Sequence, residues 1–198
     1  MLFSGLPFLY YFLPAVLVCY FAAPRKLKNA VLFVFSLIFY GWGEPRYIVL
    51  MIVSIVSGFV FALMIEKKQN KKSGLILMWI SVAVSLSFLL IFKYADFLIE
   101  NVNQLPGVSL PLSKLSLPIG ISFYTFQIIS YTVDVWRGDT KAQRNIISFG
   151  TYVSLFPQLI AGPIVRYTDI ERELQERKHS VTLAASGIKR FLIGLSKK

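Results

Sequence analysis

The stretches Leu117-Pro-Ile-Gly-Ile-Ser-Phe-Tyr-Thr-Phe-Gln127 and Phe156-Pro-Gln-Leu-Ile-Ala-Gly-Pro-Ile-Val-Arg166 are apolar enough to lie in a membrane, yet both contain proline, glycine and polar side chains. In lipid every backbone N–H and C=O must be hydrogen-bonded within the protein, so such broken segments are tolerated only where protein or a water-filled cavity surrounds them. We therefore expect both stretches to lie inside a helical membrane protein and to serve its function at membrane depth.

The composition predicts an integral membrane protein. Of 198 residues, 56% are hydrophobic and 15% aromatic, and the mean hydropathy is +0.63, which is too apolar for a soluble domain. Uncharged runs of about 17 to 25 residues can cross a hydrocarbon core roughly 30 Å thick. We predict an all-α polytopic membrane helical bundle with broken or re-entrant helices, with spans near residues 4–23, 28–43, 46–65, 74–93, 117–136 and 146–165.

The basic residues collect in three loops, and this predicts the orientation. The first loop holds Arg25, Lys26 and Lys28, the second Lys67, Lys68, Lys71 and Lys72, and the third Arg137, Lys141 and Arg144. Because short cytoplasmic loops carry the excess of Lys and Arg, we predict a multi-pass protein of the cell membrane, of the bacterial inner-membrane type, with its N-terminus extracytoplasmic.

The net charge of +11 does not indicate a nucleic-acid partner. Proteins that bind nucleic acid present basic residues to the phosphates on a polar surface, whereas the basic residues here fall mostly between predicted spans. We expect membrane lipid, including anionic lipid, to be the partner of these charges. The single cysteine, Cys19, excludes a multi-cysteine metal site, and no metal site is predicted.

Four polar residues of the fifth predicted span, Tyr124, Gln127, Tyr131 and Asp134, are spaced so that they share one helical face. A polar stripe of this kind faces the protein interior or a cavity rather than lipid. Two interpretations stay open. The stripe either makes hydrogen bonds between helices, with an ion pair between Asp134 and Arg137, or contacts a substrate directly.

Prolines and glycines predict where the two stretches depart from regular helix. Proline removes a backbone donor and clashes with the preceding turn, so the sixth segment is predicted to be kinked or re-entrant, with re-entry favoured. Gln158 lies between the breaks of that segment. The predicted structural breaks are Pro118, Gly120, Pro157, Gly162 and Pro163.

Beyond the second stretch, Thr168-Asp-Ile-Glu171 matches a capping box, which predicts a surface helix over 168–179 opened by reciprocal bonds of Thr168 and Glu171. His179, the single histidine, falls at its charged end and is interpreted as a surface residue. From Ser186 a further amphipathic element begins, and the chain looks cut at Lys198.

At its two broken stretches, at Ser130-Tyr131 and at Asp134-Val-Trp-Arg-Gly138, the sequence resembles the membrane-bound O-acyltransferase family, of the alginate O-acetyltransferase type. The resemblance implies a multi-span enzyme that moves an acyl group, usually acetyl, from a cytoplasmic donor such as acetyl-CoA or another acyl carrier. It implies an extracytoplasmic polysaccharide, or a relay acetyltransferase protein, as the acceptor, and no bound cofactor.

The resemblance also implies a catalytic histidine in an apolar stretch downstream, and no such residue occurs in this chain. His179 does not match that context, so no catalytic residue is assigned. We expect these residues to be the N-terminal part of a longer enzyme and to be inactive alone. The candidates that line or brace its substrate cavity are Tyr124, Gln127, Tyr131, Asp134, Arg137, Gln158 and Arg166.

Other functions stay open at this point. Within the same family, the protein could transfer D-alanine toward teichoic acid. A small transporter also builds sites from discontinuous helices, but no convincing inverted repeat relates residues 1–92 to 115–198. A third alternative is a non-catalytic accessory subunit of another membrane protein.

Overall fold

The computed structural model of the chain describes residues 5–103, 111, 118–159, 162, 165–177 and 180–197. In these ranges every regular element is a helix, which confirms the predicted all-α class. The π-helix η1 (Phe8–Phe12) leads into α1 (Leu13–Ala22), and the 3-10 turns η2 (Arg25–Leu27) and η3 (Pro45–Tyr47) precede α2 and α3. The remaining helices are α2 (Lys28–Gly43), α3 (Ile48–Lys67), α4 (Lys72–Val102), α5 (Ile121–Arg137), α6 (Ile146–Ser154), α7 (Phe156–Leu159), α8 (Tyr167–Gln175) and α9 (Val181–Ser196).

Two helices are long and apolar enough to cross a membrane, Pro45–Lys67 and Lys72–Val102. Only 33% and 17% of their most apolar stretches are buried inside the protein. A soluble protein would bury such apolar surface. The exposed apolar surface of these helices therefore supports a membrane protein, in which lipid covers that surface. The apolar helix Phe8–Ala22 is shorter, and the count of six spans stays a prediction.

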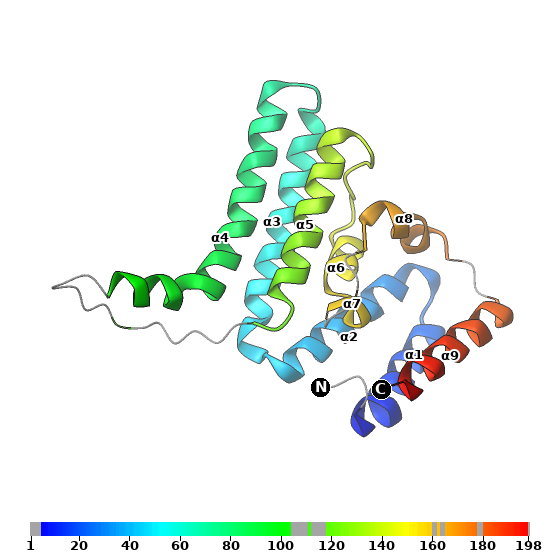
Figure 1. Cartoon of the computed structure of the whole chain (residues 1–198). Coiled ribbons are helices and arrows are strands. Elements are labelled where there is room, and N and C mark those ends of the chain that lie inside the picture. Colours follow the sequence, from blue (N-terminus) through cyan, green and yellow to red (C-terminus); the bar gives the residue numbers. More distant parts are fainter. Residues whose placement is uncertain are drawn as a thin grey trace.

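The core is a group of three helices, α3, α4 and α5, that stand side by side (Figure 1). Small residues on α3 allow this close approach. Ser54, Gly58 and Ala62 recur every fourth residue and all three are buried. A Cβ atom on Gly58 would lie 2.6 Å from Cγ2 of Ile128 on α5, so the two helices meet here with no room for a side chain.

A second cluster of aromatic rings attaches α7 to the N-terminal helices. The ring of Phe156 lies 6.1 Å from that of Phe8, 5.4 Å from Phe12 and 5.6 Å from Phe39. Edge-to-face and tilted pairs at these distances are favourable. The second broken stretch is therefore anchored on η1 and α2 at its first residue.

The sixth predicted span, 146–165, contains two helices rather than one. Asn145 caps α6, since its Oδ1 accepts from the backbone N–H of Ile147 at 2.9 Å, and α6 ends at Ser154. Pro157 accounts for this end, because its ring would clash with the carbonyl four residues earlier if the helix continued. Nine residues rise only about 14 Å, less than half of the hydrocarbon core. Pro163 lies outside the described residues.

The surface helix predicted over 168–179 is α8, but the predicted capping box is wrong. The N-cap is Arg166, with extended backbone and no side-chain cap. The helix begins at Tyr167 because this buried ring packs 5.2 Å from the ring of Tyr152. Glu171 instead accepts a hydrogen bond from Thr140 at 2.9 Å. His179 lies outside the described residues.

We expect Gly58→Ala to lower stability and Gly187→Ala not to. The added Cβ at Gly58 displaces Ile128, and overpacking of this kind costs about 1–3 kcal/mol. Gly187 lies in α9 with nothing within 4 Å of an added Cβ, so alanine there costs nothing in packing and favours helix. Thermal unfolding of the purified protein, followed by tryptophan fluorescence, measures both; an equal fall in the two variants would contradict the close contact between α3 and α5.

Candidate functional site

The polar stripe of α5 faces the interior of the protein. Tyr124 and Tyr131 are 0% exposed, and Gln127 and Asp134 are 3% exposed, whereas Phe126 on the other face is 45% exposed. The prediction that this stripe avoids lipid is confirmed. The helix is bounded by two glycines in the left-handed region, Gly120 (φ 79°) and Gly138 (φ 87°), a conformation that only glycine adopts at little cost.

The two broken stretches lie against each other at the start of α5. A Cβ atom on Gly120 would lie 2.8 Å from the backbone carbonyl oxygen of Leu159 on α7, so this glycine permits the approach of the two chains. Beside it, Nε2 of Gln127 donates a hydrogen bond to Oε1 of Gln158 at 3.2 Å. Two of the predicted site residues, which are far apart in sequence, are thus in direct contact.

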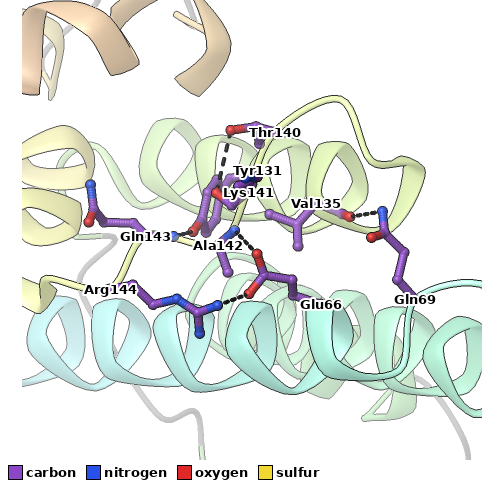
Figure 2. A network of polar contacts seen from close by, with 9 residues as sticks. All are labelled: Glu66, Gln69, Tyr131, Val135, Thr140, Lys141, Ala142, Gln143 and Arg144. Atoms are coloured by element: carbon purple, nitrogen blue, oxygen red, sulfur yellow. Dashed lines mark hydrogen bonds and ion pairs between the residues drawn. The ribbon is translucent and has the colours of Figure 1, made fainter.

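A polar network fixes the segment between α5 and α6 at the opposite end of α5 (Figure 2). Glu66, at the end of α3, accepts from the backbone N–H of Ala142 at 3.1 Å and pairs with Arg144 at 2.5 Å. Gln69 donates to the carbonyl of Val135 at 3.2 Å. The segment is therefore held against α3 by both backbone and side-chain contacts.

Tyr131 joins this network to α8. Its hydroxyl accepts from the backbone N–H of Gln143 at 2.7 Å, and its ring centroid lies 4.9 Å from that of Tyr167. Nε2 of Gln143 donates to the Tyr167 hydroxyl at 2.8 Å. Burial raises the pKa of Tyr167 to about 12, although the bond from Gln143 opposes the rise. The phenol is therefore neutral at pH 7.

Asp134 is the buried charged residue of the stripe. Its Oδ2 atom is buried and has no hydrogen-bond partner among the described residues, and the charges of Arg166 and Arg137 are close enough to favour the carboxylate form. The predicted ion pair between Asp134 and Arg137 is wrong, since no such pair occurs in the described chain. Arg137 lies in the last turn of α5 and is exposed, whereas Asp134 lies one turn earlier and is buried.

The predicted candidates thus divide between the two ends of α5. Tyr124, Gln127 and Gln158 lie toward its N-terminal end, where α7 meets it, and Asp134, Arg137 and Arg166 gather toward its C-terminal end, with Tyr131 between them. The Tyr124 hydroxyl is buried beside that of Tyr40 and makes no hydrogen bond of good geometry with the described residues. Of the predicted breaks, Pro118 accepts from the N–H of Ile121 at 3.2 Å, and Gly162 donates to the carbonyl of Gln158 at 3.2 Å.

Sequence reasoning missed a second polar stripe, on α2. Asn29 donates to Ser148 at 2.8 Å and to the carbonyl of Leu174 at 3.1 Å, and Ser36 accepts from the N–H of Phe156 at 3.2 Å. The Tyr40 hydroxyl is buried and interacts with that of Tyr124, although no hydrogen bond of good geometry joins it to any described residue. Asn29, Ser36 and Tyr40 are spaced by seven and then four residues, which places them on one helical face. This spacing could have predicted the stripe from the sequence.

Fold and site define an all-α membrane protein in which two broken, polar-bearing segments pack together inside a helical bundle. The whole chain is 38% identical to the probable alginate O-acetylase AlgI of Pseudomonas aeruginosa, of which the match covers 39%. It is 37% identical to that of Azotobacter vinelandii, covering 41% of it. Identity to the peptidoglycan O-acetyltransferase of Helicobacter pylori is 28%, again over the whole chain and 44% of that protein.

These matches confirm the resemblance seen in the sequence: the chain is similar along its whole length to alginate O-acetylases. It spans about two fifths of the length of the curated relatives it matches. No protein-family model matches the chain. No solved structure matches it either.

The contrast between two tyrosines of the stripe gives a matched test. Tyr131→Phe leaves the half-buried N–H of Gln143 without its acceptor, and loss of such a hydrogen bond costs about 0.5–1.5 kcal/mol, or more if the donor stays dry. Tyr124→Phe removes a hydroxyl that lies beside the Tyr40 hydroxyl but makes no hydrogen bond of good geometry with the described residues, so we expect a smaller loss of stability. Unfolding of each variant by SDS in mixed micelles measures the difference in free energy; equal effects would contradict the assigned hydrogen bond.

Proposed function

We propose that the whole protein is a membrane-bound O-acetyltransferase. It transfers acetyl from a cytoplasmic donor, acetyl-CoA or another acyl carrier, toward an extracytoplasmic polysaccharide, either directly or through a relay acetyltransferase protein. The names of the relatives, alginate O-acetylase and peptidoglycan O-acetyltransferase, support this reaction class. The observation that carries the proposal in this chain is the contact of the two broken stretches through Gln127 and Gln158.

Asp134, Arg137 and Arg166 form the donor side of the site in this proposal. A buried carboxylate oxygen without a partner is costly and calls for an explanation, such as a group that is absent from the structure. Arg166 and Arg137 are exposed beside it. Arginine forks bind phosphate oxygens bidentately, so the two guanidinium groups suit the phosphates of a donor such as acetyl-CoA.

The residues of this chain bind and orient in the proposed mechanism. A general base toward an acceptor hydroxyl needs a tuned pKa and a position within hydrogen-bond reach, and no described residue is assigned that role. Placing donor and acceptor in reacting geometry is itself a large part of catalysis. Gln127, Tyr131 and Gln158 hold the broken segments in place around the site, and the Tyr124 hydroxyl lies beside that of Tyr40 at its far end.

The orientation belongs to the same proposal. An extracytoplasmic N-terminus and several spans would place the basic loops, and with them Asp134 and Arg166, on the cytoplasmic side, where the donor is. The opposite end of α5 would then face the acceptor. Two spanning helices and the similarity to acetylases support a membrane location.

We expect Asp134→Asn and Arg166→Ala to lower acetyl transfer at least tenfold, because each removes a charge beside the proposed donor. Arg172→Ala is the matched control, since Arg172 is an exposed arginine of α8 outside this cluster. The variants of the whole gene are returned to a deletion strain, and O-acetyl esters on its exported polysaccharide are measured by proton NMR per unit of protein.

Two results would contradict the proposal. Lower abundance with unchanged transfer per protein would make Asp134 and Arg166 packing residues. Acetyl esters present at the same level without the gene would contradict the proposed acetyl transfer. D-alanyl esters that depend on the gene would then support the alternative, transfer of D-alanine.

A further inference from the structure

Two basic loops that are far apart in sequence lie together in the structure. Gln69, in the turn between α3 and α4, donates to the carbonyl of Val135 at the end of α5. A Cβ atom on Gly138 would lie only 2.7 Å from Nε2 of Gln69. The loop that follows α5 is thus clamped against the turn between α3 and α4. Four lysines lie in or beside the turn, and a fifth follows in the loop after α5: Lys67, Lys68, Lys71, Lys72 and Lys141.

These lysines are exposed and their charges are not neutralised by the described residues. No ion pair among the described residues involves any of the five. The nearby carboxylate of Glu66 is already occupied by Arg144 and by the N–H of Ala142. The C-terminal dipoles of α3 and α5 offset about half a charge each. A net positive surface therefore remains at this end of the bundle.

The position of the lysines relative to the membrane indicates their ligand. Lys67 ends one spanning helix and Lys72 begins the other, which places both at the depth of lipid headgroups. Below them, Ile76 and Trp79 are 59% and 61% exposed. Their spacing from Lys72 puts all three on one face of α4. A cation above an apolar, aromatic surface matches a phosphate headgroup above its acyl chains.

We propose that the lysines at the Gln69 clamp form a binding site for an anionic phospholipid headgroup, with the acyl chains lying on Ile76 and Trp79 of α4. The compact ammonium of lysine recognises phosphate as a point charge and needs no fixed fork geometry. The clamp holds two sets of cations together before binding, and such preorganisation increases affinity. This proposed site uses residues other than those assigned to the proposed acetyl transfer.

Affinity for phosphatidylglycerol tests the proposal. The purified full-length protein, in phosphatidylcholine nanodiscs, is titrated with fluorescent phosphatidylglycerol. Each basic residue near the surface contributes about fivefold in affinity, so the variant K67Q/K68Q/K71Q/K72Q should bind at least tenfold more weakly. The matched control R25Q/K26Q changes the first basic loop, which lies outside the proposed site, and should stay within about twofold, whereas a charge that took part in binding would cost about fivefold.

Three further measurements make the test sharper. Gln69→Ala keeps every charge but releases the clamp, so it should weaken binding, and Trp79→Ala should do so as well. A fall of the same size in R25Q/K26Q would overturn the site in favour of general charge attraction. Competition by inorganic phosphate or coenzyme A, with no effect of Trp79→Ala, would overturn the lipid in favour of a soluble phosphate ligand. Thermal midpoints check that each variant is folded. If phosphatidylglycerol does not bind at this site, the lipid proposal fails, while the acetyl-transfer proposal is still tested by its own assay.

Discussion

The hydrogen bond from the backbone N–H of Gln143 to the hydroxyl of Tyr131 is the contact on which the arrangement of the site depends. Tyr131 belongs to α5, its ring packs 4.7 Å from Phe149 on α6 and 4.9 Å from Tyr167 on α8, and its hydroxyl holds the segment between α5 and α6. A buried phenol must find a partner or lose the free energy of its hydration. One side chain thereby sets the positions of three helices.

The sequence predicts what depends on local periodicity. The face shared by Tyr124, Gln127 and Tyr131 follows from 3.6 residues per turn, and the structure buries all three. The all-α class follows from long uncharged runs, which a membrane favours as helix because every backbone group is then satisfied. The two ends of α5 are occupied by Gly120 and Gly138, which both adopt positive φ angles. Glycine is the residue expected in that conformation.

The sequence does not predict what depends on contacts between distant residues. Spacing of three residues suggested a pair of Asp134 and Arg137, but spacing carries no information on which side chain is buried. The pattern at Thr168 suggested a helix start that the burial of Tyr167 overrides. The stripe on α2 went unseen because Asn29, Ser36 and Tyr40 stand in an apolar run, where each looks like an isolated exception. The contact of Gln127 with Gln158 required the fold itself.

Two carboxylates at the same end of the bundle differ in how well their contacts explain their burial. Glu66 has an 18% exposed side chain, accepts the N–H of Ala142 and pairs with Arg144, so its contacts within the chain explain its position. Asp134 is more deeply buried, and its Oδ2 has no such contact. Sequences that fold well satisfy their buried groups, and exceptions concentrate where function requires them. Glu66 is thus a carboxylate whose contacts explain its position, whereas the contacts of Asp134 with the described residues do not explain its burial.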